Sequence, residues 1–217
     1  MNTGRLRRMD PERRRRLVEV SAVEFGSAGY ENASLNHIVD ACGMSKSSFY
    51  YVLPSKAHLF EFVVSELLDA VASTITIPKP EEFAGRAFWP RLERFFADLV
   101  VAAQTHESFL TLGRMFYSQS PPAEQGTVSE TLTTVRTWVE ELLLVGRASG
   151  SVYDDLPQAL QVSLAFGVIA VFDEWTMTHY DEIPPTEVGA LAAAQFATIR
   201  RMLEPSPAQT RRRPSAE

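Results

Sequence analysis

The chain has 217 residues, of which 45% are apolar and 22% charged, a composition typical of a globular protein that can bury a core. Its single cysteine, Cys42, excludes an internal disulfide framework and suits a reducing cytoplasm. The longest apolar run, residues 162–172, is too short to span a bilayer, and no apolar signal segment follows the N-terminal arginines. We therefore expect a cytoplasmic protein.

The charges are unevenly divided along the chain, which has a net charge of −6. Residues 1–60 carry nine Lys or Arg and six Asp or Glu, whereas the remaining residues carry twelve and twenty-one. A basic N-terminal segment on an acidic body indicates a nucleic-acid-binding head. A solvated, arginine-rich tail on an acidic protein is the alternative.

The first predicted helix begins at Asp10 and Pro11, as N-cap and first residue, and Gly26 and Gly29 close it. Residues 13–16 are four consecutive arginines in its first turns. We expect the basic arm and these arginines to bind DNA phosphates, which adds affinity rather than sequence discrimination.

Residues 34–59 predict two short helices joined by a tight turn, followed by the start of a third. Ser34 and Ser45 are N-caps, Gly43 supplies the turn residue, and Pro54 ends the second helix, 46–52. This pattern is typical of a helix-turn-helix, whose second helix enters the major groove. That second helix offers one cation and four hydroxyls without an acid, from Lys46, Ser47, Ser48, Tyr50 and Tyr51.

This segment resembles the TetR family of bacterial one-component transcriptional regulators over about fifty residues without a gap. The matching residues are Phe25, Gly29, Tyr30, Ser34, Ile38, Gly43, Met44, Ser45, Tyr50, Leu53, Lys56 and Leu59. Ser47 replaces a glycine that is common in the family, at a position where the family often contacts bases. The predicted DNA-binding residues are Ser34, Asn36, Ser45, Lys46, Ser47, Ser48, Tyr50, Tyr51 and Lys56. The resemblance implies that Lys56 contacts a backbone phosphate.

Helical patterns continue to the end of the body, and no alternating strand pattern of any length is present. Ser55 caps a long linking helix, and Pro78 and Pro80 mark a domain boundary. Further helices are predicted over 84–106, 109–117, 123–148, 156–179 and 186–203. We expect an all-α protein of about nine helices, three of them in the head. Its predicted division is a basic arm and helix-turn-helix domain (1–54), a linking helix (55–77), a ligand-binding and dimerisation domain (78–205) and a disordered tail (206–217).

Two surfaces are predicted in the body. The run 162–172 is apolar nearly all round, so a second subunit would cover one side; a central core helix in a monomer is the alternative. The predicted dimer interface comprises Leu164, Val168, Val171, Leu191, Gln195, Phe196 and Ile199. A pocket for a hydrophobic or aromatic small molecule would be lined by large residues that could otherwise fill core: Trp89, Phe96, Phe109, Arg114, Met115, Phe116, Tyr117, Trp138, Phe172, Trp175 and His179.

The sequence contains no convincing set of catalytic or metal-binding residues. His58 and Glu61 are spaced i, i+3, but the paired Glu-x-x-His motifs of a di-metal bundle are missing. Asp154 and Asp155 suit a helix N-terminus. We therefore expect neither cofactor nor metal, and a homodimeric repressor that a small-molecule effector releases from a palindromic DNA operator. The alternatives are a DNA-binding regulator controlled by a protein partner, and an α-helical enzyme with a vestigial head.

Overall fold

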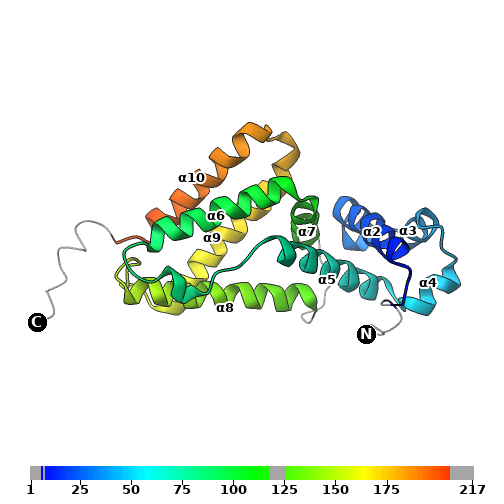
Figure 1. The fold of residues 1–217 in the computed structure, drawn as a ribbon, viewed down its shortest axis with the longest axis horizontal. Helices are drawn as coiled ribbons and strands as arrows, with labels where there is room; N and C mark the ends of the chain where they lie inside the picture. The colour runs from blue at the N-terminus through cyan, green and yellow to red at the C-terminus, as the bar shows by residue number, and fades with distance from the viewer. Residues whose placement is uncertain (1–5, 7, 118–125, 206–217) are drawn as a thin grey trace, which may run out of the picture. The chain divides into compact units, whose positions relative to one another are not determined.

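A computed structural model describes residues 6, 8–117 and 126–205 of the chain. Within these residues the fold is all-α, as predicted, with nine α-helices, two short 3₁₀ helices and no strand (Figure 1). The helices are α2 (Pro11–Asn32), α3 (Leu35–Ala41), α4 (Lys46–Val52), α5 (Lys56–Thr74), η1 (Pro80–Phe83), α6 (Phe88–Thr105), α7 (Glu107–Tyr117), α8 (Thr127–Ala148), α9 (Gln158–His179), η2 (Tyr180–Glu182) and α10 (Pro185–Leu203).

Two predicted helix ends were wrong. Gly26 does not close α2, which continues to Asn32 and leaves helical geometry only at Gly29, with φ of 75°. Helix α6 begins at Phe88 rather than at residue 84. Gly85 takes φ of 86°, a left-handed conformation, so the right-handed helix does not extend back through this residue. Pro90 then lies in the first turn of α6, where its missing N–H leaves no helical hydrogen bond unmade.

The chain forms two compact units, and each unit is built from two separate stretches of the sequence. The first unit contains Met1–Ile75 and Thr105–Thr131, and the second contains Thr76–Gln104 and Leu132–Glu217. Helix α7 packs against α2 and α5, so it completes the first unit. The sequence alone assigned this segment to the body.

An aromatic cluster lies at the centre of the first unit. Phe25 and Phe60 are fully buried and meet edge to face with ring centroids 5.1 Å apart, and Tyr30 meets Phe60 in the same way at 5.4 Å. Phe49, the inward residue of α4, and Met115 of α7 are buried in the same core. This core fixes the short helices α3 and α4 against the longer α2 and α5.

The second unit has its own core, built mainly from α6, α8, α9 and α10. Gly146 of α8 is enclosed there: a Cβ added to it would lie 2.5 Å from a Val152 methyl carbon. The buried Gln161 donates to the Tyr153 carbonyl at 2.9 Å and accepts from Arg147 at 3.3 Å. These hydrogen bonds close the loop between α8 and α9 without leaving the Gln161 amide unpaired.

Helix α9 carries an apolar surface that is exposed in the part of the chain that the structure describes. Leu160, Leu164, Val171 and Trp175 are between 43% and 63% exposed. With 100° between successive helical residues, these four side chains fall within an arc of about 60°. The segment Gln158–Glu182 is also long and apolar enough to cross a membrane by length and composition, a test that core helices of soluble proteins pass too. The apolar run 162–172, on which the sequence-based prediction rested, is by itself too short to span a bilayer.

Candidate nucleic-acid interface

Three serine hydroxyls cap the N-termini of the three helices in the predicted helix-turn-helix region, as expected from the sequence. The Ser34 hydroxyl accepts from the His37 amide at 3.2 Å, that of Ser45 from the Ser48 amide at 3.1 Å, and that of Ser55 from the His58 amide at 3.3 Å. Gly43 takes φ of 62° between α3 and α4, a left-handed conformation that favours glycine. Local chemistry therefore sets both the two helices and the turn between them.

The outer face of α4 is exposed and free of acidic groups. Lys46, Ser47, Ser48, Tyr50 and Tyr51 are all exposed, with Tyr50 and Tyr51 at 52% and 65%. No Asp or Glu occurs between residues 41 and 60. A short helix that presents hydroxyls and one cation without a carboxylate suits the edge of a base pair and its flanking phosphates.

The hydroxyls at the start of α4 form a small cluster. The Ser45 hydroxyl lies 2.8 Å from that of Ser48 and 3.1 Å from that of Ser47. Asn36 is exposed on the first turn of α3, while the Ser34 hydroxyl is occupied by capping. The structure thus brings the predicted serines of α4 together at one helix end and places Asn36 on the preceding helix.

Lys56 has an intramolecular contact that the sequence did not indicate. Its ammonium donates to the Glu31 carbonyl at 2.9 Å and lies 5.1 Å from the centre of the Tyr30 ring. These contacts tie the N-terminus of α5 to the end of α2.

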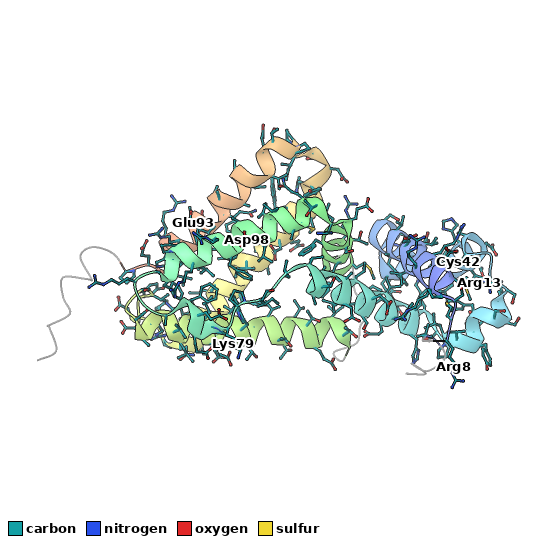
Figure 2. The ribbon with its side chains drawn as sticks, in the orientation of Figure 1. Arg8, Arg13, Cys42, Lys79, Glu93 and Asp98 are labelled. Carbon is teal, nitrogen blue, oxygen red and sulfur yellow. The ribbon has the colours of Figure 1, made fainter. Side chains whose placement is uncertain are left out.

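The four arginines of α2 divide into two kinds. Arg13 is exposed on the head (Figure 2), and Arg15 lies 3.8 Å from the carboxylate of Glu19 on the same helix. Arg14 instead pairs with Glu66 of α5, and Arg16 donates to the Ala41 carbonyl of α3. Charge alone could not separate these roles, because the partners of Arg14 and Arg16 are distant in sequence.

The structure distributes the predicted pocket residues over both compact units. In the first unit, Phe109 and Arg114 are partly buried, Met115 and Phe116 pack into the core, and the Tyr117 side chain lies outside the described part of the chain. In the second unit the core includes Trp89, Phe96, Trp138 and Phe172.

Two indole N–H groups of the second unit have backbone partners. Trp89 donates to the Ser151 carbonyl and Trp138 to the Pro78 carbonyl, each at 2.9 Å. Trp175 stacks on His179 with ring centres 4.5 Å apart near the end of α9. The first two tryptophans thus combine apolar packing with a fixed orientation.

The predicted dimer residues fall on different faces. Leu164 and Val171 are exposed on α9, whereas Val168 and Leu191 are partly buried. Phe196 and Ile199 lie in the core of the second unit, and Gln195 donates to the Thr176 hydroxyl at 2.9 Å. The exposed face of α10 consists mainly of small residues: Gly189, Ala190, Ala193, Ala194 and Ala197.

Comparison with known proteins places this head in a family. Residues 17–63 match the family model described as bacterial regulatory proteins, tetR family. The head of this chain is therefore a TetR-family helix-turn-helix domain. The match covers α3, α4 and most of α2, together with the start of α5, so it coincides with the helix-turn-helix and the helices that hold it.

Solved structures of transcriptional regulators extend the similarity of fold to the body. A regulator from Chloroflexus aurantiacus has a TM-score of 0.67 at 19% identity, with 94% of this chain and 98% of that chain covered. SCO3833 from Streptomyces coelicolor is 26% identical with a TM-score of 0.55, covering 86% and 88%. NalD from Pseudomonas aeruginosa, described as the secondary repressor of a multidrug efflux pump, has a TM-score of 0.63 at 16% identity, covering 89% and 97%. No curated protein matches the chain.

Proposed function

We propose that this TetR-family protein is a cytoplasmic, homodimeric, sequence-specific transcriptional repressor without enzymatic activity. In this proposal the α4 helices of two subunits enter successive major grooves of a near-palindromic operator, and a small hydrophobic or aromatic effector releases the DNA. The observation that carries the proposal is the exposed, acid-free face of α4 within a helix-turn-helix of TetR type. NalD, a repressor with the same fold, supports the sign of regulation.

The apolar surface of α9 supports the homodimer. Leu160, Leu164, Val171 and Trp175 extend over about 22 Å of helix. The adjacent helix α10 packs against α9 and turns its alanines outward. Across a two-fold axis, large side chains of α9 can therefore meet small ones on α10 of the other copy, which allows close helix approach.

An effector is proposed because the second unit combines many aromatic side chains with few charged ones in its interior. Trp89, Phe96, Trp138 and Phe172 lie in that core, and their surroundings suit an apolar molecule. Release of DNA requires that the effector bind the non-binding conformation more tightly than the binding one. If a protein partner controls the regulator instead, no small apolar compound will change its operator affinity.

Substitutions on α4 test the DNA-binding assignment. Lys46→Ala and Tyr50→Ala should each weaken operator binding by about tenfold or more, because base or phosphate contacts are worth about 1–3 kcal/mol each. Fluorescence anisotropy with DNA from upstream of the protein's own gene measures this, and sedimentation checks that the oligomeric state is unchanged. Lys79→Ala, which removes an exposed lysine from the second unit, is the matched control and should bind as the parent does. Parental binding by both α4 variants would show that α4 is not the recognition helix.

A further inference from the structure

Helix α3 is held at both ends by charged side chains of α2. At its N-terminus lies the Glu24 carboxylate, and at its C-terminus lies the Arg16 guanidinium. A helix N-terminus carries partial positive charge and a C-terminus partial negative charge, so each side chain has the sign that its end of α3 favours. The arrangement is independent of the apolar packing in the head.

At the N-terminus, the two oxygens of Glu24 have separate partners. One accepts from the Ser34 backbone amide at 2.8 Å, and the other lies 2.6 Å from Nδ1 of His37. In a capping box, the third residue of a helix accepts from the N-cap amide; here that third residue is His37, and Glu24 of another helix performs the task. The start of α3 is therefore fastened to α2.

At the C-terminus, Arg16 donates twice to one carbonyl. Its Nε lies 3.0 Å and its Nη2 2.8 Å from the oxygen of Ala41, the last residue of α3. That carbonyl belongs to the last turn, whose carbonyls accept no hydrogen bond from an amide within the helix. Two charged donors that converge on one carbonyl oxygen hold the end of the helix more firmly than one donor would.

The spacing along α2 matches the length of α3. Arg16 and Glu24 are eight residues apart on α2, a rise of about 12 Å, and Ser34 and Ala41 are seven residues apart, about 10.5 Å. The turn after α3 is itself tied back, because the Gly43 and Met44 amides donate to the Asp40 and Val39 carbonyls, each at 3.0 Å. A tilt of α3 on α2 would therefore carry α4 with it.

We propose that Arg16 and Glu24 are positioning residues for operator recognition, which hold α3, and through it α4, at the angle that DNA requires. The proposal rests on the proposed function and deepens it. Arg16 then acts through the Ala41 carbonyl and does not neutralise a phosphate, although it belongs to the run of arginines 13–16. This distinction is measurable, because every phosphate contact leaves a signature in the salt dependence of binding.

Arg16→Gln and Glu24→Gln are the test variants in the full-length protein, with Arg13→Gln and Glu12→Gln as controls. Arg13 and Glu12 are exposed on α2, so their replacement makes the same charge changes without touching α3. Two measurements are made on each variant. Hydrogen exchange of α3 and α4 amides is compared with that of α5 amides in the free protein, and operator affinity is measured across a salt series.

The expected result has two parts. In both test variants, α3 and α4 amides exchange about tenfold faster or more while α5 amides keep their parental rates, because a lost charge-assisted hydrogen bond shifts local opening by at least that factor. Operator affinity falls about tenfold, and the slope of log affinity against log salt for Arg16→Gln equals that of the parent protein. The control variants keep parental exchange in α3.

Three results would overturn the inference. One is parental exchange of α3 and α4 in Arg16→Gln and Glu24→Gln. Another is accelerated exchange in α5 as well, which would mean that the variants loosen the whole head. The third is a salt slope for Arg16→Gln that is shallower by about 0.9 than that of the parent protein, the mark of a lost phosphate contact. If the parent selects no DNA sequence, the proposed function fails, yet the exchange measurement still decides whether these residues hold α3.

Discussion

The exposed apolar face of α9 gives a quantitative prediction about assembly. Val171 is 63% exposed in the single chain, and a second copy would cover it. Full burial of a valine side chain contributes about 1.5–3 kcal/mol, so covering the exposed part contributes about 1–2 kcal/mol per subunit and about 2–4 kcal/mol per symmetric dimer. An aspartate at this position would lose that contribution and would also place two unpaired carboxylates in the interface.

We therefore predict that Val171→Asp raises the dimer dissociation constant by at least 30-fold, since about 1.4 kcal/mol corresponds to a factor of ten. Analytical ultracentrifugation over a concentration series measures this constant directly. Val23→Asp is the matched control, because Val23 is an equally apolar residue, 69% exposed on α2, outside the proposed interface. A Val171→Asp protein that dimerises as tightly as Val23→Asp would refute the assignment of α9 to the interface.

Three further predictions concern backbone crowding and titration. Gly146→Ala should destabilise the protein by about 1–2 kcal/mol in denaturant unfolding, because its Cβ would lie 2.5 Å from a buried methyl carbon. Gly189→Ala, whose Cβ would have no atom within 4 Å, should instead stabilise the protein by up to about 1 kcal/mol. Gly126→Ala should cost about 0.5–2 kcal/mol, because its Cβ would lie 2.4 Å from the Glu61 carboxylate that accepts from the first amide of α8; unchanged unfolding would contradict that cap. The hydrogen bond from the Ser34 amide lowers the pKa of Glu24, and the hydrogen bond from His37 lowers it further. The contribution of Glu24 to stability is therefore complete above the unfolded-state pKa of about 4.3 and is lost as the pH falls through the lower folded-state pKa. The stability difference between the parent and Glu24→Gln should accordingly shrink below about pH 4 in acid unfolding curves, and a constant difference would contradict it.

The head could be predicted from sequence because its signals are local. Ser34, Ser45 and Ser55 cap helices through amides three residues away, and Gly43 takes its left-handed conformation within the turn it forms. The exposed face of α4 lies opposite Phe49, the one fully buried residue of this helix. Sequence periodicity and turn chemistry act over the same short range, so these features were accessible.

The parts that the sequence could not predict depend on contacts between distant residues. Met115 packs in the head core although it lies more than fifty residues beyond α4, and helical periodicity does not reveal which core a helix joins. On α10, both Phe196 and the alanines follow helical spacing, but only the ring contacts of Phe196 with Trp89 and Phe96 of α6 show that it faces inward. The partners of Arg16 and Lys56 are backbone carbonyls, which carry no sequence signal.

Sequence selection by the purified protein from a pool of randomised duplex DNA tests the central claim most directly. The account predicts enrichment of one motif with two-fold symmetry, whose half-sites are separated by about one helical turn or more, and bound by a dimer with an affinity that falls steeply with salt. Recovery of no motif, or binding that is equal for all sequences at every salt concentration, would contradict sequence-specific regulation.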